Sequence, residues 1–196
     1  MASPRPKLLP ATEQAHALIL ERLAPGDTAI DATVGNGHDT KFLADCVGPS
    51  GKVIGFDVQV TAVEKASLLV CDSPQVILHQ AGHETISAHV SEEVEAVTFN
   101  LGYLPAGDKS IITKAPTTIK ALETSLRLLS ETGIITVVVY SGHEGGLIES
   151  RALNDWAASL DQKAFSVIRY GFLNQQNSPP YLLAIEHQAN LRADTK

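Results

Sequence analysis

The chain has 196 residues, 44% of them hydrophobic, and a formal net charge of −7. These values predict one domain, residues 1–196, with enough apolar side chains to build a core. The excess of acidic residues argues against a broad basic surface that binds nucleic acid, although a local basic patch is still compatible with this composition. Because no apolar run approaches the length of a membrane span and the first residues lack the apolar core of a signal peptide, we expect a cytoplasmic protein without a membrane segment.

The first segment predicts an irregular arm followed by a helix. Residues 1–10 contain three prolines. Thr12 is the expected N-cap, because its hydroxyl can accept a hydrogen bond from a free backbone N–H. Apolar side chains then recur at helical spacing until residues 25–27 end the helix. They are Ala15, Leu18, Ile19 and Leu23.

Residues 28–40 predict a strand, a glycine turn and the start of a helix. The strand ends at Asp31, and the chain turns through Gly35 and Gly37 before a helix over residues 41–47. Glycine reaches backbone angles closed to other residues and lets a ligand approach the main chain. The turn leads into a helix N-terminus, where free N–H groups favour a carboxylate or phosphate. The pattern is typical of a nucleotide-like cofactor site, although an ordinary strand–helix turn also fits and the third glycine of a dinucleotide site is absent.

The position of Asp31 makes a more specific interpretation possible. The pattern D-x-x-x-G-x-G resembles the first motif of class I methyltransferases that use S-adenosylmethionine (SAM). In that family the loop wraps the methionine part of SAM, and the acidic residue helps to hold its amino group directly or through water. Thr33 stands here in place of the family's usual extra glycine. The resemblance implies that the cofactor-binding residues of this loop are Asp31, Thr33, Gly35, Asn36, Gly37, His38 and Asp39.

A second strand is predicted over residues 52–57, and it ends in Asp57. Asp57 follows Gly37 by twenty residues, about the spacing at which an acidic residue meets ribose hydroxyls in such folds. A carboxylate suits this contact because it accepts from two neighbouring hydroxyls at once. Asp57 could also cap the helix predicted over residues 60–70, and the two roles are compatible. Gln59, in the same loop, is assigned to the cofactor site with it.

A third strand over residues 76–79 leads to His83. In the methyltransferase fold the loop at this position borders the adenine. The resemblance therefore implies that His83 stacks on the base or forms a hydrogen bond with it. A surface histidine without that role is the alternative.

The fourth predicted strand, residues 96–99, delivers the hexapeptide Asn-Leu-Gly-Tyr-Leu-Pro. This hexapeptide resembles the N-P-P-Y motif of enzymes that methylate amine or amide nitrogens. In those enzymes the Asn side chain and a following backbone carbonyl accept hydrogen bonds from the acceptor nitrogen, while the aromatic ring stacks on a planar group. The resemblance implies catalytic roles for Asn100 and Tyr103, a substrate contact at Leu101, and a place for Asn100 beside the cofactor. The alternative is a hairpin turn with a core tyrosine.

The remainder of the chain predicts two helices and three strands. The first helix follows residues 113–116 and ends before Gly133, and its apolar side consists of Ile119, Leu122, Leu126 and Leu129. After it come a wholly buried strand over 134–140, a helix ending near residue 160, and strands over 164–171 and 181–186. Two final strands without a long helix between them are typical of an antiparallel closing pair. The fold class is therefore α/β: a class I methyltransferase (Rossmann-like) three-layer sandwich, with a seven-stranded, mostly parallel sheet and an antiparallel last strand.

Four motifs occur in order along nearly the whole chain: D-A-T-V-G-N-G-H-D-T, G-F-D-V-Q, N-L-G-Y-L-P-A-G-D-K and Y-S-G-H-E-G-G. Together they resemble the bacterial rRNA methylase family, whose members act as tRNA wobble-uridine methyltransferases that convert 5-aminomethyl-(2-thio)uridine to its methylaminomethyl form. The resemblance implies SAM as the cofactor, no metal, and the anticodon loop of tRNA as partner, for a monomer or a homodimer. The substrate-binding residues that it implies are Leu101, Tyr103, Asp108, Lys109, His143 and Glu144.

The chemistry of such an acceptor sets a requirement on the site. A primary alkylamine is protonated at neutral pH and then has no lone pair with which to attack. The site must favour the neutral amine through desolvation or through a nearby proton acceptor. The groups that could orient the amine or accept its proton are Asn100, the Leu101 carbonyl, Asp108, His143 and Glu144. The cations that could hold RNA phosphates are Arg5, Lys7, Lys109, Lys114 and Arg169.

Other functions compete with methylation of tRNA. The same fold could methylate rRNA or a small-molecule amine, and the acidic charge favours the small molecule. A nucleotide-binding module or a dehydrogenase is a further alternative, against which the missing third glycine counts. A metal hydrolase could use the pairs 83–84 and 143–144, each His-Glu, but they lack the H-E-x-x-H spacing. Cys46 and Cys71 lie in apolar helical patterns and are expected to be buried free thiols rather than a disulfide or a metal pair.

Overall fold

The computed structural model describes residues 8–104, 110–142 and 145–188. Its centre is one seven-stranded sheet in the order β3-β2-β1-β4-β5-β7-β6. The strands are β1 (Thr28–Asp31), β2 (Lys52–Asp57), β3 (Val76–Gln80), β4 (Val94–Leu101), β5 (Leu129–Val139), β6 (Phe165–Tyr170) and β7 (Tyr181–His187). The first five run parallel, and β7 runs antiparallel to both β5 and β6. The predicted fold class and its antiparallel closing pair are confirmed.

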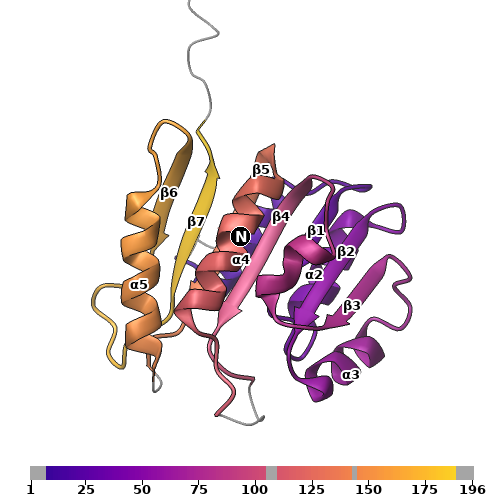
Figure 1. Ribbon diagram of the computed structural model, residues 1–196, viewed down its shortest axis with the longest axis horizontal. Helices are drawn as coiled ribbons and strands as arrows, with labels where there is room; N and C mark the ends of the chain where they lie inside the picture. The colour runs from indigo at the N-terminus through magenta and orange to yellow at the C-terminus, as the bar shows by residue number, and fades with distance from the viewer. Residues whose placement is uncertain (1–7, 105–109, 143–144, 189–196) are drawn as a thin grey trace, which may run out of the picture.

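Helices cover both faces of the sheet (Figure 1). They are α1 (Ala11–Leu20), α2 (His38–Val47), α3 (Val60–Leu69), α4 (Ala115–Leu128), α5 (Gly146–Ser159) and the short 3-10 helix η1 (His83–Ala88). On one face α1 contacts β5 and β7, and α2 contacts β1, β2 and α3. On the other face α4 contacts both η1 and α5. The molecule therefore has the three layers expected from alternating strands and helices.

The buried strands divide their side chains between two apolar clusters. Ile135 and Val137 of β5 belong to the cluster under α4 and α5, whereas Ile134 and Val138 belong to the cluster under α1 and α2. Alternate residues of a strand point to opposite faces, so a strand covered on both faces must be apolar at nearly every position. This requirement explains the continuous run of Val and Ile in β5.

Three local predictions were wrong. Thr12 is not the N-cap of α1, because the helix begins at Ala11 and Pro10 precedes it without a side-chain cap. Leu129 is not helical: β5 begins there, five residues before position 134, and Leu129 pairs with Val94. Cys71 is exposed and Cys46 is half-buried, and both are free. Cys71 lies beyond the last turn of α3, where the buried face of that helix has ended.

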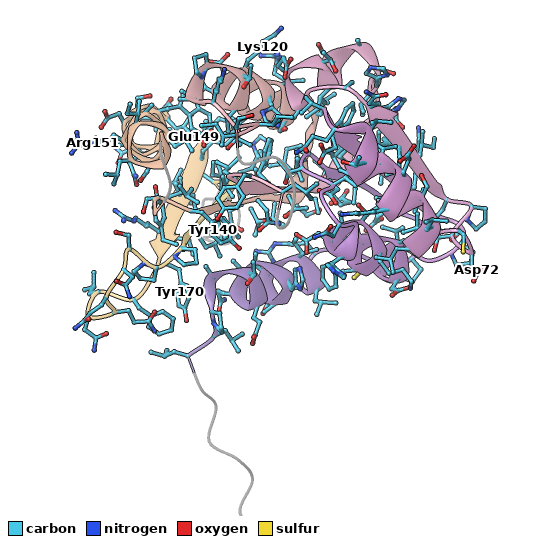
Figure 2. All side chains as sticks on the ribbon, turned by 90° about the horizontal axis from the view of Figure 1, so that it is seen from below. Asp72, Lys120, Tyr140, Glu149, Arg151 and Tyr170 are labelled. Atoms are coloured by element: carbon cyan, nitrogen blue, oxygen red, sulfur yellow. The ribbon has the colours of Figure 1, made fainter. Side chains whose placement is uncertain are left out.

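The order of the strands creates a crevice at one edge of the sheet. The chain builds β2 and β3 outward on one side of β1, and then returns to place β4 on the other side. Open α/β sheets bind ligands at such a switch point, beyond the carboxyl ends of the strands. Figure 2 looks toward the end of the sheet at which β4 ends, with Tyr140 just after β5 and Glu149 on α5.

Candidate active site

A cavity of about 1000 Å³ lies at the carboxyl ends of the parallel strands. Its wall combines the residues after β1, β2, β3, β4 and β5 with residues 177–180 from the connection between β6 and β7. The predicted site residues in its wall are Thr33, Gly35, Asn36, His38, Asp39, Asp57, Gln59, His83, Asn100, Leu101 and Tyr103. Asp31 and Gly37 are not in the wall. The predicted substrate contacts Asp108, Lys109, His143 and Glu144 lie outside the described residues.

The glycine turn has the positive φ angles that its sequence predicts. Gly35 has φ of 54° and Gly37 has φ of 84°. Gly37 immediately precedes α2, and a Cβ there would lie 2.8 Å from Ala66 of α3. Gly37 is therefore required for helix packing, while Gly35 is the glycine that reaches the cavity. Because α2 begins at His38 rather than at residue 41, the cavity residues His38 and Asp39 form its first turn.

Asp31 is wholly buried beneath this turn. One carboxyl oxygen accepts a hydrogen bond of 2.6 Å from Thr40 Oγ1, and the other accepts one of 3.1 Å from the Thr33 N–H. Burial, reinforced by the negative charge of Asp39, raises the pKa of Asp31 to about 7. The carboxyl group thus shapes the loop from behind. Its predicted contact with the amino group of the cofactor stays a prediction, and Asp39 is the acidic residue of this loop that reaches the cavity.

Asp57 joins the end of β2 to the glycine turn. Its Oδ2 accepts a hydrogen bond of 2.8 Å from the Gly35 N–H, and its Oδ1 accepts one of 2.9 Å from the Gln59 N–H. The side chain therefore orders the residues that precede α3, as the capping alternative suggested, although Gln59 is the N-cap position. Each carboxylate oxygen has a second lone pair, so Asp57 can still accept hydrogen bonds from a ligand in the cavity.

His83 is a buried residue of the cavity wall, with 8% of its surface exposed. The surface alternative is therefore wrong. Its Nδ1 lies 3.2 Å from the Ala32 carbonyl oxygen, which can only accept, so Nδ1 carries the proton. Burial lowers the pKa of His83 and favours the neutral ring. Nε2 is then an acceptor, and it is buried without a hydrogen-bond partner among the described residues.

Asn100 is the next to last residue of β4 and is bound on two sides. Its backbone N–H donates to Thr33 Oγ1 at 2.7 Å, and its Nδ2 donates to Asp39 Oδ2. A carboxylate can only accept, so the amide must turn its nitrogen toward Asp39. Its oxygen Oδ1 is buried and has no partner within the described part of the chain.

Tyr103 follows β4 in the chain and belongs to the cavity wall. Tyr103 forms an isolated antiparallel bridge with Ile112, so the hairpin alternative was partly right. Tyr103 is not a core residue, however, because 40% of its surface is exposed and it lines the cavity. An aromatic ring in this position can stack on a planar ligand.

Glu149 of α5 (Figure 2) forms hydrogen bonds with one residue before α4 and one residue within it. Only 3% of its surface is exposed. It accepts hydrogen bonds from the hydroxyls of Thr113, at 2.6 Å, and Thr118, at 2.8 Å. The Thr113 hydroxyl in turn accepts from the Gly102 N–H at 2.9 Å. Gly102, just beyond β4, is therefore linked through Thr113 to Glu149, which is far from both in sequence.

Sequence reasoning also missed His16 of α1. Its Nε2 lies 2.8 Å from Asp39 Oδ1, and its ring stacks on Phe42 with 4.0 Å between centroids. Neither His16 nor Glu149 lies in a motif or beside its polar partners in sequence. Only the packing of α1 and α5 on the sheet could have identified them.

The described residues contain neither a cluster of metal ligands nor a membrane-spanning helix. No group of three or more His, Cys, Asp or Glu residues in residues 8–104, 110–142 and 145–188 could hold a metal ion. No described helix is long and apolar enough to cross a membrane.

The chain is similar to known methylases. A family model described as "Putative rRNA methylase" matches residues 53–186. The Arabidopsis thaliana protein named tRNA (mnm(5)s(2)U34)-methyltransferase, chloroplastic, is 37% identical over 182 residues, which cover 86% of this chain and 66% of that protein. The chain thus spans just under two thirds of the length of this relative.

Two solved structures share the architecture over nearly the whole chain. One is described as a putative rRNA-methylase from Clostridium thermocellum, with 42% identity and a TM-score of 0.92 over 93% of this chain and 100% of that chain. The other, described as a putative methyltransferase from Streptococcus mutans in complex with SAH, has 37% identity and a TM-score of 0.86 with the same coverage. The chain therefore belongs to the rRNA methylase family and has the class I methyltransferase fold.

Proposed function

We propose that this protein is an RNA N-methyltransferase that methylates the amine of 5-aminomethyl-(2-thio)uridine at the wobble position of tRNA. One observation carries the proposal: Asn100, whose buried Oδ1 has no hydrogen-bond partner among the described residues, and Tyr103, which is 40% exposed, both belong to the wall of the cavity at the end of β4. An amine needs such an acceptor, and a nucleobase needs such a ring. The 37% identity to a protein named as a tRNA (mnm(5)s(2)U34)-methyltransferase supports the choice of nucleoside.

The cofactor side of the cavity fits SAM by its chemistry. The backbone at Gly35 would border the methionine part, and the Asp57 carboxylate would accept from the ribose hydroxyls. His83 Nε2, an acceptor without a partner in the described part of the chain, would accept from the exocyclic amino group of the adenine. When bound, SAM supplies a methyl group on a positively charged sulfur, and the amine nitrogen takes this methyl group as the carbon–sulfur bond breaks to leave S-adenosylhomocysteine.

The cavity also has room for the acceptor. Small-molecule sites commonly measure roughly 300–1,000 Å³, and this cavity is at the upper end of that range. We assign to Asn100 Oδ1 the task of accepting an N–H of the neutral amine, which leaves the nitrogen lone pair free to attack. Tyr103 would stack on the uracil ring. Much of the rate would come from alignment of the nitrogen with the methyl carbon, because SAM is already an activated donor.

Contact with RNA must be local, because the chain carries a net charge of −7. Among the described cations proposed from the sequence, Lys114 lines the cavity. Arg169 lies over the ring of Tyr181, with 4.0 Å between its Cζ atom and the ring centroid. An anticodon loop would be held by stacking of unpaired bases and a few phosphate contacts, which makes its binding fall steeply with salt.

The test is mass spectrometry of digested nucleosides. The protein and SAM are incubated with tRNA from cells that lack the wobble-uridine methylation, and a sample without SAM serves as control. Formation of 5-methylaminomethyl-2-thiouridine would support the proposal. No conversion by a protein that still binds SAM would refute it, and parallel incubations with rRNA and with small amines would then identify the acceptor class.

A further inference from the structure

We propose that His16 and Asp39 form a positioning pair that holds the Asn100 amide in the orientation needed for methyl transfer. The inference rests on the proposed function, since it concerns the same acceptor amine. It adds a residue of α1, outside every sequence motif, to the machinery of the site. His16 is not in the cavity wall and would act only through Asp39.

Asp39 sets the orientation of the Asn100 amide. An Asn side chain has two nearly isosteric ends, a donor and an acceptor, and a site for an amine needs the acceptor end. Asp39 Oδ2 receives a hydrogen bond from Asn100 Nδ2 and thereby turns Oδ1 the other way. If the amide rotated by half a turn, its oxygen would face a carboxylate oxygen, and two acceptors repel.

Asp39 is itself held by His16. Its Oδ1 accepts from His16 Nε2 at 2.8 Å, so the two oxygens of one carboxylate bind two different side chains. The side chain of Asp39 is 17% exposed and that of His16 is 33% exposed. The His16 ring is itself held, because it stacks on Phe42 of α2 with an interplanar angle of 14°.

Such a support has an energetic reason. A buried acceptor without a donor is unfavourable, and Asn100 Oδ1, which has no partner among the residues that the structure describes, would relax toward any nearby donor if the amide could turn. The chain of contacts from His16 through Asp39 keeps this oxygen available for an N–H of the ligand. Misplacement of a catalytic group by about 1 Å can cost about 100-fold in rate, so a loosened amide should lower kcat.

The experiment compares two substitutions of His16 with a matched control. His16→Phe keeps a ring on Phe42 but removes the hydrogen bond, whereas His16→Gln can restore a donor to Asp39. We expect His16→Phe to lower kcat on the hypomodified tRNA about tenfold, with the Kd for SAM unchanged and the variant still folded at the assay temperature, and His16→Gln to regain most of that loss. The control is His187→Phe, because His187 also packs on a phenylalanine, Phe165, and lies within hydrogen-bond reach of a carbonyl, but outside the cavity wall.

A double substitution tests whether the effect runs through Asn100. Once Asn100 is replaced by Ala, there is no amide to orient, so adding His16→Phe should lower kcat no further. The proposal would be overturned if His16→Phe lowered kcat by the same factor in the Asn100→Ala background as in the wild type. It would also be overturned if His16→Gln lowered kcat as much as His16→Phe does.

A measurement that needs no RNA separates this inference from the proposed function. In a nitrogen–proton correlation spectrum, the side-chain amide of Asn100 should shift in His16→Phe and Asp39→Ala and stay in place in His187→Phe. If the wild-type protein methylates no tRNA and these shifts are seen, the substrate is wrong and the positioning pair stands. If tRNA is methylated and the Asn100 side-chain amide signal does not shift in His16→Phe, the assignment of the positioning pair is wrong.

Discussion

The two sides of the cavity are built in different ways. On the side that we assign to the cofactor the connections are short, residues 32–37, 58–59 and 81–82. Asp57, at the end of β2, accepts hydrogen bonds from the backbone N–H groups of Gly35 and Gln59 in two of them. On the acceptor side the connections span residues 102–114, 140–145 and 171–180. That side presents rings and apolar groups to solvent, and Tyr103, Ile111 and Tyr140 are each about 40% exposed.

The difference in connection length matches two tasks: binding a cofactor that is the same for every methyltransferase of this fold, and recognising an acceptor that differs between them. A short loop tied to neighbouring strands by backbone hydrogen bonds has one conformation, which suits a cofactor that is always the same. Longer connections supply side chains without fixing the nature of the acceptor, and such loops carry specificity in many folds. Damage to the cofactor side should therefore weaken SAM binding, and damage to the acceptor side should spare it.

The largest expected effect is on the acceptor side. Asn100→Ala removes the amide oxygen that we assign to the amine, and we expect kcat to fall by about 100-fold. Because SAM can still bind to the glycine turn and Asp57, its Kd should change little. Methyl-transfer assays on hypomodified tRNA measure kcat, and calorimetry measures the Kd for SAM. Methyl transfer at a near-normal rate would show that Asn100 does not serve the acceptor.

The next effect belongs to the cofactor side. Asp57→Ala removes a carboxylate that accepts from two backbone N–H groups and is proposed to accept from the ribose. Hydrogen bonds to charged groups contribute about 1.5–3 kcal/mol, so the Kd for SAM should rise by about 10- to 100-fold. Asp72→Ala is the control, because Asp72 is an exposed residue (Figure 2) outside the cavity wall. Equal Kd values for the two variants would contradict the assignment of Asp57.

A smaller effect is expected at the ring on the acceptor side. Tyr103→Ala should raise KM for tRNA about tenfold, because stacking on one base contributes about 1–3 kcal/mol. Tyr103→Phe keeps the ring and should stay within about twofold of the wild type. A loss of the same size in both variants would mean that stacking is not the role of this side chain.

The smallest effect concerns the loop behind the cofactor side and depends on pH. Burial raises the pKa of Asp31 to about 7, so between pH 4 and 7 the folded state binds a proton that the unfolded state has released. The stabilisation that Asp31 provides is therefore present at low pH and is lost as the pH rises through 7. We expect wild type to lose about 1 kcal/mol of unfolding free energy relative to Asp31→Asn between pH 6 and 7.

Urea unfolding of both proteins at several pH values measures this difference. A difference that stays constant from pH 5 to 8 would mean that Asp31 titrates normally in the folded protein. Activity need not follow this curve, because Asp31 lies outside the cavity wall.

Local sequence determined much of the fold and the cofactor side. Strands buried on both faces must be apolar at nearly every position, so β1, β2 and β5 stand out as runs, although Leu129 shows that an apolar pattern alone does not separate the end of a helix from the start of a strand. The glycines of the turn have positive φ angles that other residues rarely adopt, which ties them to a unique conformation. Asp57 and Asn100 could be predicted as residues of the cavity wall because they lie at the carboxyl ends of parallel strands, where open sheets place their ligands. Asp57 is the last residue of β2, and Asn100 is the next to last residue of β4.

Only the tertiary structure decided which of these groups face the cavity and what holds them. Asp31 and Asp39 lie on either side of one loop, but the fold buries the first and exposes part of the second to the cavity. His16 is 23 residues from its partner Asp39, and Asn100 is 61 residues from it, so no local pattern joins them. Glu149 reaches Thr113 across 36 residues because α5 packs beside α4. Sequence determines a conformation where the constraint lies within a few residues, and contacts between distant elements appear only when the layers pack.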